Sequence, residues 1–315
     1  MTNRLNDERG QAVLLTVLFL IVLLGASALT IDVGAWYREQ RQAQATADQA
    51  VLSGAQTLPV STAQALADTQ TYADKNGGGV VAGSIKTLFG LQPNDTVTVT
   101  IQRPAPGFFA KVLGVSSVTV QAKAAARAGL PIAVYGAAPI VVSKDHPLLA
   151  GAGCPCFNQE TTLPLDKTGA PGAFGFVDFD NTGSNGNPPL SAWITDGYQG
   201  ELDLGLYDSD PGAKMNGVLT SALDLRTGSD LLFPVFDTLG GTGSTAQYDI
   251  IGWVGFHLDC FGLAVSTTNC QNQNGNSQTL TGYFTKVIWK GLLSSSGSNN
   301  SNEPDYGVDT VNLVN

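Results

Sequence analysis

The chain has 315 residues, more than one small hydrophobic core needs, and this length fits an anchoring segment followed by two domains. Charged residues make up only 13% of it, about half the share of a typical soluble domain, and the net charge is −10. An acidic, lysine-poor chain is a poor match for nucleic acid or for electrostatic binding to anionic lipid, so we expect neither.

The most distinctive stretch is apolar and carries no charge between Arg9 and Asp32. As a helix, residues 12–31 would extend about 30 Å, which is the thickness of a bilayer's hydrocarbon core. We predict a transmembrane helix at residues 11–34 behind a cytoplasmic tail of residues 1–10. Its predicted anchoring side chains are Val13, Leu14, Leu18, Phe19 and Leu23 in the apolar run, with Trp36 and Tyr37 in the headgroup layer.

Two other interpretations of this stretch stay open. A signal peptide could be cleaved after the small residues 26–28, although the apolar run continues through Leu29 and Ile31 beyond that site. Prepilin-type processing could occur after Gly10, although Leu15 stands where prepilins usually carry glutamate. Asp32 ends the run, and a carboxylate there must reach the interface or a partner cation.

We infer the orientation from composition, because basic residues are nearly balanced on the two sides of the apolar run and their count therefore does not decide it. The chain has four cysteines, all beyond the run, together with many glycines and asparagines, which is typical of an exported protein. We therefore expect a single-pass protein of the cytoplasmic membrane, with the N-terminus inside, the bulk outside and membrane lipid around the helix.

Residues 35–130 are predicted to form a helical stalk and a small α+β module. The helix should continue toward Pro59, a second helix should run from the capping sequence at Ser61 to Lys75, and strands are expected at 95–103 and 117–128. Small residues recur at every fourth position, at Ala26, Thr30 and Gly34 and again at 43, 47 and 55. This spacing indicates contact with another anchor helix, or simply an alanine-rich helix.

Residues 131–315 alternate short apolar runs with turn residues, which predicts a mostly antiparallel β domain of sandwich or barrel type with one helix near 216–225. The expected fold class is therefore α+β. The cysteines predict two disulfides, with three pairings open; free thiols remain an alternative, and zinc fits poorly because Cys-Pro-Cys lacks a two-residue spacer. The four cysteines are Cys154, Cys156, Cys260 and Cys270.

Signals for chemistry are weak. Asp178 and Asp180 resemble the start of a calcium loop, but Pro189 stands where such a loop needs glutamate, so an Asp/Asn turn is the better interpretation. His257 precedes Leu258-Asp259, yet the chain has no Gly-x-Ser-x-Gly elbow, which favours a structural histidine. We expect no enzyme, no cofactor and no bound metal.

The N-terminal residues resemble a known family. Glu8 to Val13, the apolar run, Asp32-Val33-Gly34-Ala35-Trp36-Tyr37 and the helix to Ala55 are similar to the start of TadE/TadG-like proteins of the Flp (tight adherence) pilus system. Residues 97–128 also resemble the next segment of proteins in that family, and the chain beyond Pro131 is similar to a less characterised extension. The resemblance implies a membrane-anchored, pilin-like or assembly component whose partners are other pilus proteins.

We therefore predict a non-enzymatic component of an Flp-type pilus that acts through protein–protein contacts. A second hypothesis is an envelope-anchored adhesin or carbohydrate-binding β module. A third is a tethered hydrolase that uses His257, for which the sequence offers no accompanying nucleophile.

Overall fold

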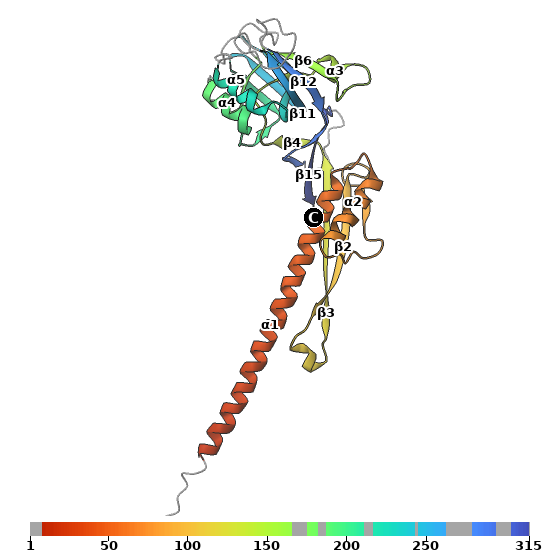
Figure 1. Ribbon diagram of the computed structural model, residues 1–315, viewed down its shortest axis with the longest axis vertical. Helices are drawn as coiled ribbons and strands as arrows, with labels where there is room; N and C mark the ends of the chain where they lie inside the picture. The colour runs from red at the N-terminus through yellow and green to blue at the C-terminus, as the bar shows by residue number, and fades with distance from the viewer. Residues whose placement is uncertain are drawn as a thin grey trace, which may run out of the picture. The chain divides into compact units, whose positions relative to one another are not determined.

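The computed structural model describes residues 8–165, 175–181, 187–210, 217–242, 245–262, 279–293 and 304–314 (Figure 1). They divide into two compact units. The first contains the chain up to Arg127 together with the C-terminal end from Leu313, and the second runs from Ala128 to Asn312. The fold class is α+β with mostly antiparallel sheets, as predicted.

The first unit is organised by one continuous helix, α1 (Glu8–Ala55). No proline interrupts it, and its leucine-, valine-, alanine- and glutamine-rich sequence favours the helix along its whole length. Every side chain from Ala12 to Ser27 is exposed. Among the described residues, α1 is the one helix long and apolar enough to cross a bilayer.

The C-terminal half of α1 packs on α2 (Thr62–Lys75) and on an antiparallel sheet of β1 (Lys86–Leu88), β2 (Thr96–Pro106) and β3 (Ser117–Gly129). The β2–β3 hairpin ends in the short 3₁₀ helix η1 (Ala110–Leu113). The small residues of α1 that face this layer are fully buried. They include Ala43, Ala47, Val51 and Ala55. The second small-residue stripe therefore packs within the chain.

Helices α1 and α2 approach closely at Gly54. A Cβ atom added there would lie 2.6 Å from the carbonyl oxygen of Ala65 and closer still to the Thr69 hydroxyl. Helix α2 begins at the predicted cap, because the Ser61 hydroxyl accepts a hydrogen bond from the backbone N–H of Gln64 at 3.3 Å. The Gln64 side chain donates to Asp68 instead of completing a capping box.

Arg103 on β2 joins three segments of the first unit. Its guanidinium donates hydrogen bonds to the carbonyl oxygens of Asn76 (2.8 Å) and Gly78 (3.0 Å) in the loop after α2. It also donates to the Thr46 hydroxyl of α1 (3.2 Å) and lies 3.8 Å from the Glu39 carboxylate. The planar donor fork suits this set of acceptors, and the side chain is only 12% exposed. The loop after α2 is thereby fixed to both the helix and the sheet.

The second unit is built around its longest strand, β11 (Gln247–Gly262). This strand pairs with β10 (Ser229–Gly240) along most of its length, with β12 (Thr279–Thr285) at its C-terminal half and with β9 (Gly205–Ser209) at its N-terminal half. The main order is β5-β10-β11-β12-β6, and only the β5–β10 pair is parallel. The outer strands of this sheet are β5 (Val142–Ser143), β6 (Glu160–Pro164) and β7 (Val177–Asp178), which pairs with β9.

Two smaller strand groups complete the second unit. A three-stranded antiparallel sheet has the order β14-β4-β8, formed by β14 (Gly291–Leu293), β4 (Pro131–Val134) and β8 (Leu202–Asp203). Strand β13 (Val287–Ile288) pairs in parallel with the start of β15 (Val308–Val314). The short helix α3 (Pro147–Ala150) follows β5.

Helices α4 (Asn187–Asp196) and α5 (Gly217–Arg226) pack together against the main sheet. They share one buried cluster with β10, β11 and β12. Its large members include Leu190, Ile194, Leu219, Leu223, Phe233, Phe256 and Phe284. Helix α5 matches the one predicted in this region, whereas α4, which begins with Asn-Pro-Pro, was not predicted. Proline is tolerated in a first helical turn, where its missing N–H needs no partner.

Candidate membrane and assembly interface

The N-terminal half of α1 presents an apolar surface that no other part of its unit covers. The five predicted anchoring side chains of the apolar run are each between 50% and 67% exposed. They are Val13, Leu14, Leu18, Phe19 and Leu23. A continuous apolar surface of this extent marks contact with a membrane or another protein, because exposing it to water is costly. This half of α1 could therefore span a membrane.

Asp32, in contrast, is almost fully buried, with 1% exposure. Its carboxylate accepts hydrogen bonds from three consecutive backbone N–H groups at the end of the β2–β3 hairpin, those of Phe108 (2.8 Å), Phe109 (3.1 Å) and Ala110 (2.6 Å). The partner of Asp32 is thus a set of peptide groups, and not the cation or the interfacial water that the sequence led us to expect.

The two predicted interfacial aromatic residues differ in their surroundings. Trp36 is half-buried, and its indole N–H donates to the carbonyl oxygen of Pro106 at 3.1 Å, one turn beyond Asp32. Tyr37 is 60% exposed, and its hydroxyl accepts a hydrogen bond from Arg41 at 3.0 Å. Trp36 therefore helps to hold the hairpin against α1, while the exposed ring of Tyr37 lies beneath the Arg41 guanidinium, 5.7 Å from the ring centre.

The first small-residue stripe is exposed. Ala26, Thr30 and Gly34 each lie on the surface, and a Cβ atom added at Gly34 would meet nothing within 4 Å. At about 100° per residue, the stripe lies on nearly the opposite side of the helix from Asp32. The Thr30 hydroxyl is satisfied by the carbonyl oxygen of Ala26 at 2.8 Å. The hairpin thus leaves this face of α1 uncovered, and its use in a helix–helix contact stays a prediction.

A family model matches this helix. The model, "Putative Flp pilus-assembly TadE/G-like" (Tad), covers residues 10–57, which we call the TadE/G-like segment. The resemblance predicted from the N-terminal residues is confirmed over this segment, and it associates the chain with Flp pilus assembly. The predicted similarities of residues 97–128 and of the chain beyond Pro131 stay predictions. No curated protein and no solved structure matches the chain.

The TadE/G-like segment comprises nearly all of α1 and ends in the turn that leads to α2. It therefore contains the exposed apolar half, Asp32, the exposed stripe, and the buried small residues including Gly54. Sequence reasoning found the exposed features. It missed the partner of Asp32 and the role of Arg103, because both depend on a hairpin that is far away in the chain.

Two of the predicted disulfide cysteines, Cys154 and Cys156, bond to each other with an S–S distance of 2.01 Å. Cys260 on β11 is not free, and Cys270 lies outside the described residues. The Cys154–Cys156 bond closes a small ring immediately after α3.

The described part of the second unit contains an open cleft of about 990 Å³ beside this disulfide. Four aspartates and one lysine line it, with Leu149, Ile251 and Tyr306 supplying apolar surface. The charged residues are Lys144, Asp145, Asp237, Asp249 and Asp305. Lys144 pairs with Asp237, and this contact raises the pKa of Lys144. Burial, with the nearby carboxylates of Asp237 and Asp145, raises the pKa of Tyr306 to about 12.

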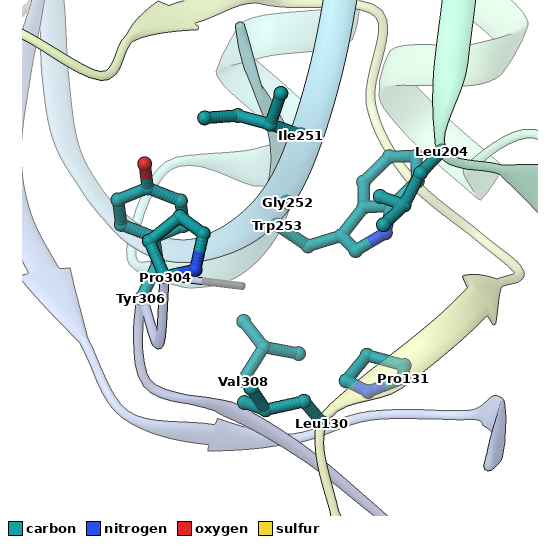
Figure 2. Close-up of a pocket in the computed structure, with 9 residues that line it drawn as sticks. All are labelled: Leu130, Pro131, Leu204, Ile251, Gly252, Trp253, Pro304, Tyr306 and Val308. Atoms are coloured by element: carbon teal, nitrogen blue, oxygen red, sulfur yellow. The ribbon is translucent and has the colours of Figure 1, made fainter. Parts of the chain in front are cut away.

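A second, much smaller cavity adjoins the same tyrosine (Figure 2). In Figure 2, Leu204 and Trp253 lie on one side and Pro304 and Tyr306 on the other, with Leu130, Pro131 and Val308 closing the base. Its volume of about 20 Å³ accommodates roughly one water molecule. It is therefore a packing gap beneath the cleft and too small for an organic ligand.

The weak calcium candidates lie in a turn. The carboxylate of Asp178, at the end of β7, accepts a hydrogen bond from the backbone N–H of Asp180 at 3.2 Å, which is the geometry of an Asx turn. Pro189, at the position where a calcium loop needs glutamate, lies in α4, and residues 182–186 fall outside the described residues. No group of three potential metal ligands occurs among the described residues.

His257 is held by its neighbours on the sheet. Its Nδ1 lies 2.7 Å from a carboxylate oxygen of Asp230 on β10, and its ring stacks on Tyr283 of β12 with 4.8 Å between the ring centres. His257 pairs with Asp230 on one side and with Tyr283 on the other in the strand register. These contacts fix the imidazole as a cross-strand link.

Proposed function

We propose that this protein is a membrane-anchored structural or assembly component of an Flp-type pilus, with its N-terminus inside and the bulk of the chain outside the cytoplasmic membrane. One observation carries the proposal: the TadE/G-like segment coincides with a continuous helix whose first half is apolar and uncovered. The second half of that helix is the core of a folded module. A single helix thus joins the membrane to the rest of the first unit.

Assembly would use the uncovered stripe of Ala26, Thr30 and Gly34. Small side chains at four-residue spacing let two helix backbones approach closely, which favours association within a membrane. The stripe is exposed and lies opposite the attachment point of the hairpin, so a second helix would find it accessible. Its partner would be the anchor helix of another pilus protein.

A role through contacts, without catalysis, is supported by the surroundings of the one candidate base. His257 is bound to Asp230 and stacked on Tyr283, both on neighbouring strands, which accounts for its presence in the sheet. The sequence also contains no Gly-x-Ser-x-Gly elbow.

The proposal can be tested by co-purification from the native host. The tagged chain would be extracted from membranes, and the pilus components that accompany it would be quantified by mass spectrometry. We expect these components with the wild type and a several-fold loss with the double substitution Ala26→Leu and Gly34→Leu, because added bulk keeps the helices apart.

Ile21→Phe is the matched control, since Ile21 is exposed on the same helix and lies on the face opposite the stripe. It should leave the recovery unchanged. Recovery of the chain in the soluble fraction, or from membranes without any pilus component, would contradict the proposal. An intact mass beginning at Gln11 would instead identify a processed, pilin-like subunit, and one beginning at Leu29 a secreted protein.

A second function, binding of carbohydrate by an envelope-anchored adhesin, is favoured by the open cleft of the second unit. Its carboxylates are strong acceptors for sugar hydroxyl groups, and Tyr306 and Ile251 offer apolar surface beside them. Glycan binding by the purified chain that weakens at least several-fold in Asp249→Asn would support this function. Absence of binding across a broad glycan panel would count against it.

A further inference from the structure

The end of the β2–β3 hairpin, residues 107–116, exposes several large apolar side chains; we call it the hairpin tip. Val112 and Leu113 are 88% and 85% exposed, and Phe108 is 58% exposed. Phe109 and Val115 are exposed as well. Lys111 is the one charged residue in this sequence of ten. Water-soluble loops rarely carry such a cluster, so the hairpin tip needs an apolar environment.

The hairpin tip lies beside the apolar part of α1 (Figure 1). A groove of about 610 Å³ separates the two, and its walls are almost entirely apolar. The helix contributes residues between Leu24 and Asp32, and the hairpin tip contributes Phe109, Ala110, Val112 and Leu113. The hairpin tip therefore reaches back along α1 past Asp32, alongside the last third of the uncharged run.

We propose that the hairpin tip is immersed in the outer half of the bilayer and that lipid acyl chains fill the groove between it and α1. This inference rests on the membrane anchor of the proposed function. If residues 12–31 span the hydrocarbon core, residues 24–31 occupy its outer 12 Å or so, and anything beside them is surrounded by lipid. The hairpin tip is beside them.

Keeping the hairpin tip in water would leave too little helix to cross the membrane. The span would have to end before Leu24, so only residues 12–23 would remain, about 18 Å of helix. A hydrocarbon core of about 30 Å cannot be crossed by that length without strong distortion of the bilayer. The span cannot move toward the N-terminus either, because Arg9 and Glu8 lie there.

The backbone of the hairpin tip is already suited to lipid, where every peptide group must find a partner inside the protein. The Asp32 carboxylate takes the N–H groups of residues 108–110. The N–H groups of Gly107, Val112, Gly114 and Val115 donate to carbonyl oxygens of the hairpin itself, at 3.0 Å each. Asp32 thus accepts hydrogen bonds from the N–H groups that the turn would otherwise leave without an acceptor. These N–H groups in turn provide hydrogen-bond donors for a carboxylate at the membrane boundary.

Lys111 fits the same placement. Its side chain is exposed, and four methylene groups allow its ammonium to reach the phosphate layer from a position just below it. The hairpin tip then forms a second, shallow attachment that fixes the first unit's rotation about α1, which a single helix alone would leave free.

Spin-label accessibility tests this placement in the full chain. Single cysteines would be introduced by Val112→Cys at the hairpin tip, Leu23→Cys in the anchor and Val60→Cys in the loop after α1, with the native disulfides kept oxidised. Val60 is the matched control, because it is an exposed valine of 83% exposure in the same unit. The labelled proteins would be reconstituted at low density into phosphatidylcholine–phosphatidylglycerol vesicles, and collisions with oxygen and with a water-soluble nickel chelate would be measured.

We expect the label at 112 to resemble the label at 23, with high oxygen and low nickel accessibility, and the label at 60 to show the reverse. A label at 112 that behaves like the label at 60, while the label at 23 is immersed, would overturn the hairpin-tip placement and leave the anchor intact. Exclusion of both reagents from residue 112 would show that protein covers the hairpin tip, and would overturn the lipid assignment. Nickel access at residue 23 would refute the anchor, and with it both proposals.

Discussion

Gly54 sets how closely helices α1 and α2 can approach, so Gly54→Ala should destabilise the first unit. Alanine gains about 1 kcal/mol over glycine from helix propensity. Against this, its Cβ would lie 2.6 Å from the carbonyl oxygen of Ala65 and nearer still to the Thr69 hydroxyl, well inside contact distance. Overpacking of this kind typically costs about 1–3 kcal/mol, and the upper end applies here because the Cβ would meet rigid backbone. Subtracting the gain of about 1 kcal/mol in helix propensity leaves an expected net loss of about 2 kcal/mol.

The assay is amide hydrogen exchange of residues 62–75 in the detergent-solubilised chain. A loss of about 2 kcal/mol should accelerate exchange of the most protected amides roughly 25-fold. Removing the obstructing hydroxyl with Thr69→Ala should restore part of the protection in the double variant. Gly34→Ala is the control, because its Cβ would meet nothing. Unchanged exchange in Gly54→Ala, or no coupling with Thr69→Ala, would refute the close-approach argument.

Three further predictions concern charged side chains. Arg103→Met should cost about 3 kcal/mol in thermal or chemical unfolding of the first unit, because several carbonyl oxygens lose a charged donor, and Arg103→Lys should recover only part of it. Burial raises the pKa of the Asp309 carboxyl to about 6. The stability that the protonated carboxyl contributes to the folded state is therefore present below pH 4 and is lost as the pH rises through 6. Asp309→Asn should therefore stabilise the second unit by about 3 kcal/mol at pH 8 and leave it nearly unchanged at pH 4 in denaturation curves; an equal effect at both pH values would contradict the assignment. Asp32→Ala should accelerate amide exchange of residues 108–110 at least about tenfold, since all three donors lose their acceptor, whereas Asp48→Ala on the same helix should leave these amides unchanged.

Local sequence determined most elements of the first unit. The uncharged run, the cap at Ser61 and the alternating residues of β2 and β3 each act over a few residues, so their positions could be predicted closely. In the second unit, α4 was missed because Asn-Pro-Pro is equally compatible with a turn and with a first helical turn. Packing of α4 against the main sheet selects the helix, and this packing cannot be read from a local sequence pattern.

The functional residues divide in the same way. An apolar run of twenty residues is long enough to span a bilayer whatever surrounds it, so local sequence is sufficient to predict a candidate anchor and its family resemblance. The two small-residue stripes of α1 look alike in the sequence, yet one is buried under α2 and the other is exposed. Only tertiary structure separates them, because the difference depends on where the later helix packs.

Asp32 shows the limit most clearly. A carboxylate at the end of an apolar run needs a partner, and this need is visible in the sequence. The identity of that partner is not visible in the sequence, because the three peptide groups that bind Asp32 lie more than seventy residues away and have no side-chain signature. A backbone N–H becomes a specific ligand only when the chain has been folded into a turn at the right place, and that placement is a property of the tertiary structure alone.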